Sequence, residues 1–178
     1  MCVEIEAKLK VDSLPEVEQK LAELGAEFLA EQLQTDYLFD DIDSALTTTD
    51  RCLRLRCQSV AGSERFFLTY KGAKEKSNFK KRQEIEIEIK DAESTRKLLS
   101  ALGYVKVLVV EKNRRLWRLG GCAVALDQLP LLGAFVEIEG PDDKKITDVQ
   151  QSLGLTNLPH ITKSYAQLTK EERERRDA

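Results

Sequence analysis

The stretch Val3-Glu4-Ile5-Glu6-Ala7-Lys8-Leu9-Lys10 alternates apolar and charged side chains without a break. Alternation of this length is typical of a β-strand with one apolar and one polar face. Glu4, Glu6 and Lys8 then share the polar face, and the two glutamates lie roughly 6.5–7 Å apart along it. Their charges repel each other unless a cation or water separates them. For one such strand, a solvated outer face is the simplest interpretation. Whether the charged face is solvated or enclosed therefore depends on whether the alternating pattern recurs elsewhere in the chain.

The alternation does recur, and each time the polar face carries charges of one sign. The acidic clusters are Glu84 with Glu86 and Glu88, and Glu137 with Glu139; the basic clusters are Arg54 with Arg56, and Lys112 with Arg114. An ordinary exposed sheet face would mix small polar residues with charges of both signs opposed across strands. Like-charge clusters suit bound ions better than bulk water. We therefore expect the charged faces to be enclosed and the apolar faces to pack outward on helices.

The order of elements predicts an α+β fold dominated by one large antiparallel sheet or barrel of about eight strands, with flanking helices. Short glycine-containing connections at 61–63 and 120–121 are of hairpin type. Amphipathic helices are expected at 14–24, 92–102 and 142–153, the last being the final helix. Strand, helix, Leu-Gly and strand follow one another twice, at 3–28 and 84–109, which predicts an internal repeat. The polar segment 41–50 and the lysine-rich segment 72–79 are expected to be loops, the second of them mobile.

Composition sets limits on the partners. The chain has 178 residues, 42% hydrophobic and 33% charged, which suits a single domain, predicted at 1–168 with a solvated charged tail at 169–178. The net charge of −3 gives no global basic field, so nucleic acid is not an expected partner. No apolar run approaches the length of a membrane span, and no signal-peptide pattern opens the chain. Four cysteines without a C-x-x-C pair indicate reduced thiols in the cytoplasm. The spacing leaves both a monomer and a homodimer open.

The two kinds of cluster point to one kind of ligand. Closely spaced carboxylates can share a hard divalent cation such as Mg²⁺, which binds one or two carboxylates together with substrate phosphates. Arginines and lysines that converge from several strands supply donors matched to phosphate oxygens. A polyphosphate that carries its own metal needs both sets at once.

Ordered motifs carry a resemblance to a known family. They are Glu4-x-Glu6-x-Lys8, Asp36-Tyr37-Leu38-Phe39-Asp40, Leu53-Arg54-Leu55-Arg56, Thr69-Tyr70-Lys71-Gly72, Arg82-x-Glu84-x-Glu86, Lys112-x-Arg114, Leu126-Asp127, Leu132-Gly133-x-Phe135-Val136-Glu137-Ile138-Glu139 and Ser164-Tyr165. With them the chain resembles the CYTH superfamily of triphosphate tunnel metalloenzymes, most closely the class IV adenylate cyclase-like branch with its thiamine triphosphatase relatives. The resemblance implies an eight-stranded antiparallel β-barrel whose charged tunnel binds a triphosphate with Mg²⁺ or Mn²⁺.

The resemblance also implies roles, position by position. The metal side comprises Glu4, Glu6, Asp127, Glu137 and Glu139. The phosphate side comprises Lys8, Arg54, Arg56, Lys71, Arg82, Lys112 and Arg114, of which Lys8, Lys112 and Arg114 are the candidate catalytic residues. Glu84 and Glu86 match acidic tunnel positions with three open roles: holding water, holding a second metal, or balancing the arginines.

The motifs are shared by branches with different reactions, so three functions stay open. The first is the cyclase reaction, which converts ATP to cyclic AMP and pyrophosphate. The second is hydrolysis of tripolyphosphate, thiamine triphosphate or a nucleoside triphosphate. The third is binding of a polyphosphate or nucleotide without turnover, which the presence of both acids and bases disfavours. None of them needs a histidine, and the one histidine, His160, lies late in the chain beside Pro159.

Overall fold

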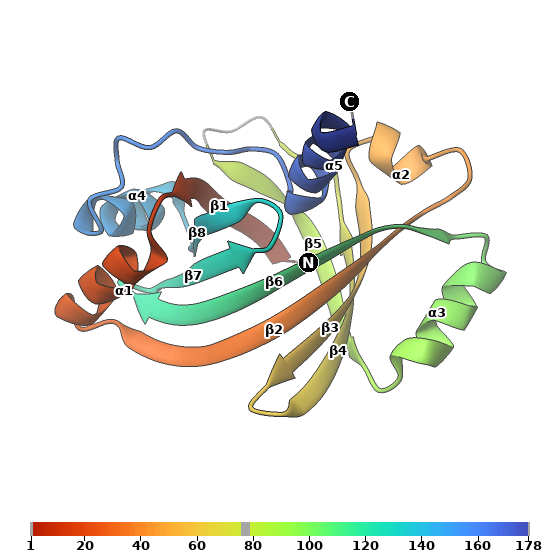
Figure 1. Ribbon diagram of the computed structural model, residues 1–178, viewed down its shortest axis with the longest axis horizontal. Coiled ribbons are helices and arrows are strands. Elements are labelled where there is room, and N and C mark those ends of the chain that lie inside the picture. The colour runs from red at the N-terminus through yellow and green to blue at the C-terminus, as the bar shows by residue number, and fades with distance from the viewer. Residues whose placement is uncertain (1, 76–78, 178) are drawn as a thin grey trace.

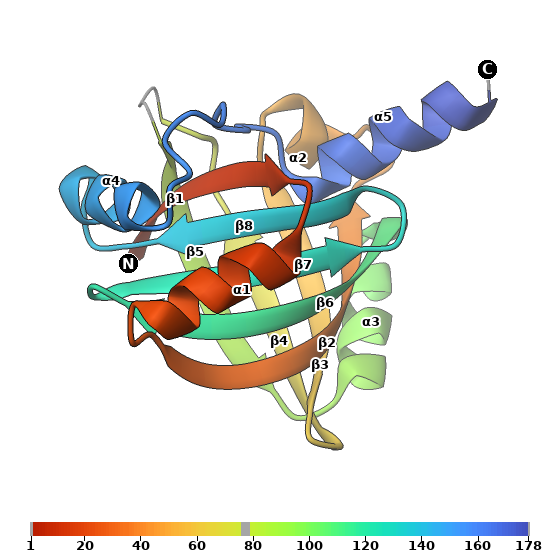
Figure 2. The ribbon, with the colours of Figure 1, turned by 60° about the vertical axis from the view of Figure 1, so that its left-hand side comes forward.

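The eight strands close into one antiparallel barrel. The structure is a computed structural model that describes residues 2–75 and 79–177. In these residues the strands are β1 (Cys2–Val11), β2 (Glu27–Asp40), β3 (Cys52–Val60), β4 (Ser63–Lys71), β5 (Lys80–Ile89), β6 (Val105–Leu119), β7 (Cys122–Leu129) and β8 (Gly133–Glu139). Around the barrel they follow the order β1-β5-β4-β3-β2-β6-β7-β8, with β8 closing on β1. Figures 1 and 2 show this closed barrel, which confirms the predicted α+β fold.

Helices lie on the outside of the barrel and beside its cavity. They are α1 (Leu14–Glu23), α2 (Ala45–Thr48), α3 (Ala92–Ala101), α4 (Asp143–Ser152) and α5 (Tyr165–Asp177). Of these, α1, α3 and α4 pack on the outside of the barrel, and α2 and α5 contribute side chains to its cavity. Leu21 of α1 and Ile146 of α4 are fully buried in one cluster with the outward residues of β1, β7 and β8, such as Leu9. Leu99 of α3 packs against Leu55 on a second part of the wall. Figure 2 shows α1 and α4 over the β1–β8–β7 side and α3 at the β2–β3 side. The apolar faces of β1, β7 and β8 therefore lie outside, under helices, whereas Ile85 and Ile87 on the outer face of β5 are about half exposed.

The predicted internal repeat is confirmed. The units β1-α1-β2 and β5-α3-β6 have the same order, and their strands pair with each other, β1 with β5 and β2 with β6. Each helix begins at a side-chain cap, because Ser13 accepts a hydrogen bond from the Glu16 amide and Asp91 accepts one from the Glu93 amide. Each ends before a glycine with positive φ, Gly25 at 71° and Gly103 at 90°.

Two segments differ from the sequence prediction. The polar loop predicted at 41–50 contains the short helix α2, whose backbone amides at Leu46 and Thr47 donate to the buried carboxylate of Asp40. The helix predicted at 142–153 is not the last one, because the segment taken as a solvated tail is the C-terminal part of α5. Only the first turns of α5 carry apolar residues, which is why the sequence showed no amphipathic pattern there.

Three further predictions concern loops, thiols and membranes. The predicted mobile loop 72–79 is described only at 72–75 and 79, so its middle lies outside the described residues. Cys52, Cys57 and Cys122 are free thiols. None of the helices in the described part of the chain is both long and apolar enough to cross a bilayer.

Candidate active site in the barrel

The interior of the barrel is a cavity of about 840 Å³ lined by charged side chains. Because side chains alternate along a strand, burying Ala7 and Leu9 under the helices turns Glu4, Glu6 and Lys8 inward. In the other strands, too, the charged side chains of the site point inward and the apolar ones between them point outward. Thirteen of the predicted site residues line this one cavity: Glu4, Glu6, Lys8, Arg54, Arg56, Lys71, Arg82, Glu84, Glu86, Lys112, Arg114, Glu137 and Glu139. The prediction that the charged faces are enclosed agrees with this geometry except at Glu88, which is about half exposed, contacts Arg65 and does not line the cavity.

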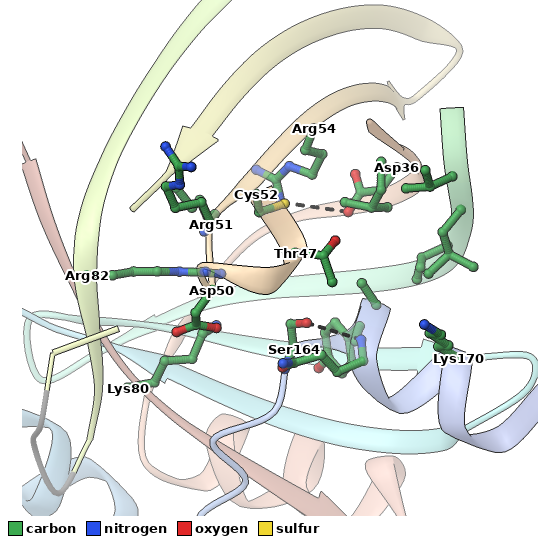
Figure 3. A pocket seen from close by; sticks show the side chains of 18 of the residues that line it. Asp36, Thr47, Asp50, Arg51, Cys52, Arg54, Lys80, Arg82, Ser164 and Lys170 are labelled. Atoms are coloured by element: carbon green, nitrogen blue, oxygen red, sulfur yellow. Dashed lines mark hydrogen bonds and ion pairs between the residues drawn. The ribbon is translucent and has the colours of Figure 1, made fainter. Parts of the chain in front are cut away.

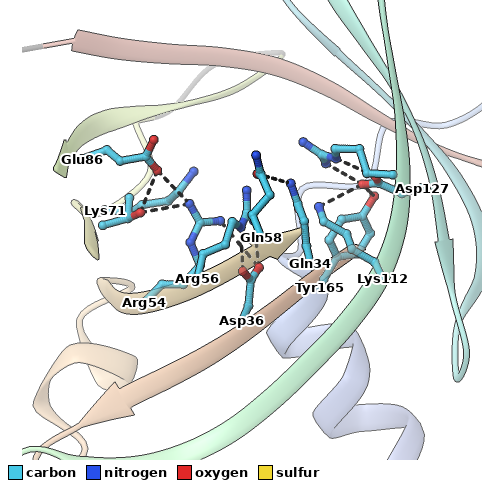
Figure 4. A network of polar contacts seen from close by, with 12 residues as sticks. Gln34, Asp36, Arg54, Arg56, Gln58, Lys71, Glu86, Lys112, Asp127 and Tyr165 are labelled. Carbon is cyan, nitrogen blue, oxygen red and sulfur yellow. Dashed lines mark hydrogen bonds and ion pairs between the residues drawn. The ribbon is translucent and has the colours of Figure 1, made fainter. Parts of the chain in front are cut away.

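The remaining predicted residue, Asp127, is fully buried behind the cavity wall. Its carboxylate accepts two hydrogen bonds from Arg114, at 2.6 and 2.5 Å, and one from Lys112 at 3.1 Å. The Tyr165 hydroxyl donates a further one at 2.9 Å (Figure 4). Arg114 also bonds Glu137, which in turn lies 3.3 Å from the Lys8 ammonium. Acids and bases on this wall therefore hold one another in fixed positions.

This crowded wall shifts proton affinities. Burial lowers the pKa of Lys112 to about 8, and the neighbouring Arg114 guanidinium contributes in the same direction. Burial also lowers the pKa of Lys8, although Glu137 opposes the shift. Burial alone would raise the pKa of Glu137, but Lys8 and Arg114 hold it well below its usual range. Glu137 is therefore ionised at neutral pH, and Lys112 loses its charge within a moderately alkaline range.

A second cluster of charged side chains comes from β2, β3 and β5. Arg56 donates to both oxygens of Asp36, at 2.6 and 2.8 Å, and Arg54 approaches Asp36 at 3.7 Å. Arg54 also contacts Glu86 at 3.3 Å (Figure 4) and Glu84 at 3.8 Å. Of the three roles left open for Glu84 and Glu86, the observed contacts fit the balancing of arginines.

Two guanidiniums in the cavity have unused donors. Within the described residues, the buried Nε–H groups of Arg54 and Arg82 have no hydrogen-bond acceptor. A buried donor without an acceptor is costly and is rare in native structures. Figure 3 shows both arginines at the cavity together with Thr47 of α2 and Lys170 of α5. An anion in the cavity would supply the missing acceptors.

The carboxylates of β1 and β8 form the acidic part of the cavity. Glu4 accepts from the Lys71 ammonium at 2.7 and 2.8 Å, and Glu6 accepts from Lys80. Glu139 is paired with Glu6 in the β1–β8 register and lines the cavity at an exposed end. Its partial burial, together with the charges of Glu4 and Glu6, raises the pKa of Glu139 to about 7. Negative charge is therefore incompletely compensated here.

These carboxylates suit a hard divalent cation by their chemistry. Mg²⁺ and Mn²⁺ prefer oxygen ligands, and no ion pair within residues 2–75 and 79–177 reaches Glu139. In the described chain no three acidic, histidine or cysteine side chains are close enough together to form a ready metal cluster. Glu4 and Glu6 instead hold lysines, so a cation would have to exchange with them.

Sequence reasoning missed three residues of this site. Asp36 and Tyr165 lay inside recognised motifs, but only the β2–β3 register and the docking of α5 place them beside Arg56 and Asp127. Lys80 lies at the start of β5, next to the lysine-rich loop, where alternation does not yet define a face. Counting back by twos from Arg82 would have found it.

Known proteins share both the sequence pattern and the fold. The CYTH domain pattern matches residues 3–165. The chain is 32% identical over 175 residues to "Putative adenylate cyclase MJ0240" of Methanocaldococcus jannaschii, covering 93% of this chain and 98% of that protein. It superposes on the PH1819 protein from Pyrococcus horikoshii OT3 with a TM-score of 0.83 at 31% identity, covering 96% and 99% of the two chains.

A more distant likeness concerns the fold alone. The HpAC1 protein from Hippeastrum superposes with a TM-score of 0.72 at 17% identity, covering 94% and 95% of the two chains. That protein is described as an adenylyl cyclase candidate with a dominant triphosphatase activity. Because the CYTH pattern spans nearly the whole sequence and the MJ0240 relative covers it at 32% identity, this chain belongs to the CYTH domain family.

Proposed function

We propose that this chain is a divalent-metal-dependent enzyme that acts on a triphosphate, and that it converts ATP to cyclic AMP and pyrophosphate. The balance of charge in the cavity carries the proposal. Among the described residues, twelve basic and eleven acidic side chains line it, so its formal charge is close to neutral. A bare triphosphate would add several uncompensated negative charges to a partly buried site, which is costly. Each Mg²⁺ or Mn²⁺ that accompanies the triphosphate cancels two of these negative charges and so brings the cavity closer to balance.

In this proposal the basic side chains of the cavity bind the phosphates and the acidic side chains bind the metal. Arg54, Arg56 and Arg82 offer planar forks of donors to phosphate oxygens, and Arg54 and Arg82 already have an unused one. Lys71 of β4 and Lys112 of β6 add ammonium donors. Glu4, Glu6, Glu137 and Glu139, with Asp127 behind them, would hold the metal. When bound, that metal would neutralise charge on the phosphoryl oxygens and polarise the phosphorus.

Catalysis in this proposal is electrostatic. In the cyclase reaction the ribose 3′-hydroxyl attacks the α-phosphorus and pyrophosphate leaves. Lys8, Lys112 and Arg114 lie on one wall, held by Glu137 and Asp127, and stabilise the negative charge that moves onto the leaving oxygens. No covalent nucleophile is required, because preorganised cations and correct alignment account for most of phosphoryl-transfer catalysis.

The cavity also has an apolar part, which supports an organic substrate. Leu38, Leu108 and Val110 line it beside Ala166 of α5. An inorganic triphosphate has no group to place against such a surface, whereas the nucleoside of ATP has one. The name of the MJ0240 relative points the same way.

Hydrolysis of tripolyphosphate, thiamine triphosphate or a nucleoside triphosphate is the second candidate. It requires only phosphate ligands, metal and water, and the basic side chains of the cavity lining would supply the first of these. Cyclisation additionally requires the ribose to be held in line with the α-phosphorus. The Hippeastrum protein illustrates that a cyclase name in this fold does not fix the product.

Product analysis separates the candidates. Purified protein is incubated with ATP and Mn²⁺ or Mg²⁺, and separately with tripolyphosphate, and the products are resolved by chromatography. Cyclic AMP with an equal amount of pyrophosphate supports the cyclase proposal. Orthophosphate from tripolyphosphate with no cyclic AMP would assign the hydrolase instead. Tight binding of both ligands without any product would refute an enzymatic role.

A further inference from the structure

Both glutamates of the opening motif already hold a cation of the protein itself. The Lys71 ammonium lies 2.7 and 2.8 Å from the two oxygens of Glu4, and the Lys80 ammonium bonds Glu6. All four side chains are about nine-tenths buried or more. These pairs are therefore part of the cavity interior and not of its solvated rim.

The strand register fixes where these side chains lie. Glu6 of β1 is paired with Lys80 of β5. Lys71 of β4 is paired with Glu84 of β5, which it also contacts at 2.8 Å, and it reaches Glu4 across β5. The backbone hydrogen bonds of a closed barrel leave these residues no freedom to move apart. Only the ammonium groups, on flexible four-carbon stems, can swing to another acceptor within the cavity.

A lysine ammonium and a divalent cation compete for the same carboxylate oxygens. Like charges at contact distance repel strongly in a partly buried site. A metal bound by Glu4 and Glu6 must therefore displace Lys71 and Lys80 from their present positions. Each displaced ammonium, if left unpaired in the interior, would carry a large desolvation cost.

We propose that Lys71 and Lys80 are resident counter-ions of the metal site, and that a divalent cation releases them to bind the phosphates of the substrate. This inference rests on the proposed function and deepens it. It assigns to Lys80, which the family resemblance did not single out, the role of a positioning residue that couples the two ligands. Metal binding alone takes Glu6 from Lys80 and Glu4 from Lys71, which keeps only its second partner Glu84 at 2.8 Å, and phosphate binding then restores the lost contacts. Each ligand consequently favours the other by the same factor.

The test measures Mn²⁺ binding alone, by isothermal titration calorimetry on the full chain. Lys80→Met should bind Mn²⁺ about tenfold more tightly than the wild type, since the competing ammonium is gone. Lys81→Met is the matched control, because it removes the same charge at the next position of the chain. The Lys81 side chain contacts Glu75 and does not line the cavity. Its Mn²⁺ affinity should equal that of the wild type.

A second measurement tests the other half of the coupling. At saturating Mn²⁺, Lys80→Met should bind tripolyphosphate about tenfold more weakly than the wild type, because one phosphate loses its donor. Lys71→Met frees Glu4 in the same way and should shift both affinities in the same directions. It therefore provides the test if Lys80→Met does not fold.

The outcomes separate this inference from the proposed function. Unchanged Mn²⁺ affinity in both lysine variants, with Mn²⁺ binding intact in the wild type, would overturn the counter-ion role and leave the metal requirement standing. Failure of the wild type and of every variant to bind Mn²⁺, with or without tripolyphosphate, would overturn both.

Discussion

The substitution Asp36→Asn probes the polar network on the phosphate side of the cavity. Asp36 is 8% exposed and accepts both hydrogen bonds of Arg56, while Arg54 lies 3.7 Å away. Arg54 keeps Glu84 and Glu86 after the change, but Arg56 has no other carboxylate partner within the described residues. Breaking a buried ion pair from one side costs about 3–5 kcal/mol, and the retained partners of Arg54 favour a loss of about 3 kcal/mol.

Urea unfolding followed by circular dichroism measures this loss of unfolding free energy directly. Thermal unfolding gives a second measure: for a chain of this size, 1 kcal/mol corresponds to about 2–4 °C in Tm, so the Tm should fall by roughly 6–12 °C. Adding tripolyphosphate with Mn²⁺ should raise the Tm of Asp36→Asn more than that of the wild type, because a phosphate supplies the acceptor that Arg56 has lost. A larger Tm increase on ligand binding in Asp36→Asn than in the wild type therefore identifies Arg56 as a phosphate ligand.

The same variant has a defined pH dependence. Burial opposes ionisation of Asp36, but Arg56 and Arg54 more than offset it and hold the pKa of that carboxyl below its usual range. A depressed pKa contributes stability that is present above the unfolded-state value of about 3.9 and lost as the pH falls through the folded-state value. The wild type should lose this contribution in acid, and Asp36→Asn should have none to lose.

An exposed pair of the same geometry provides the control. Arg65 donates to both oxygens of Glu88, at 2.9 and 2.7 Å, but both side chains are about half exposed. Glu88→Gln should therefore leave the unfolding free energy nearly unchanged. A loss below about 1 kcal/mol in Asp36→Asn, or no larger stabilisation by ligand than in the wild type, would refute the buried-network argument.

Three further predictions follow from the site and the helix that closes it. Glu6→Gln should abolish metal-dependent turnover while circular dichroism shows an intact fold, and full activity in this variant would remove Glu6 from the metal site. The kcat/KM for the triphosphate should fall as the pH rises through about 8, where Lys112 loses its proton; Lys112→Arg should abolish this decline, and an unchanged profile would assign it to another group. A chain ending at Thr169 keeps Tyr165 and the apolar start of α5, so it should unfold in one transition near the wild-type Tm, and a collapse of stability would contradict the predicted boundary at 168.

Much of this architecture follows from local sequence patterns. Alternation alone predicted that Glu4, Glu6 and Lys8 share a face, and the like-charge clusters predicted that this face is enclosed. Caps such as Ser13 and Asp91 are local signals and were found at the expected places. These features depend on neighbours within a few residues, which a sequence displays directly.

The features that escaped prediction are non-local. Lys80 meets Glu6 across 74 positions of sequence, and Tyr165 meets Asp127 across 38. Their contacts depend on strand register and on where α5 docks, neither of which any single segment encodes. Helix α5 was missed for a related reason: its apolar contacts end near Leu168, and the charged remainder shows no helical periodicity.

The central claim is that the barrel interior binds a triphosphate together with a divalent metal. A crystal structure of the protein with Mn²⁺ and a non-hydrolysable ATP analogue tests it most directly. We expect phosphate oxygens within hydrogen-bonding distance of Arg54, Arg56 and Arg82, and Mn²⁺ on the carboxylates of Glu4 and Glu6 in place of the lysines. An analogue bound on the outer surface, with Lys71 and Lys80 still on the two glutamates, would contradict the account.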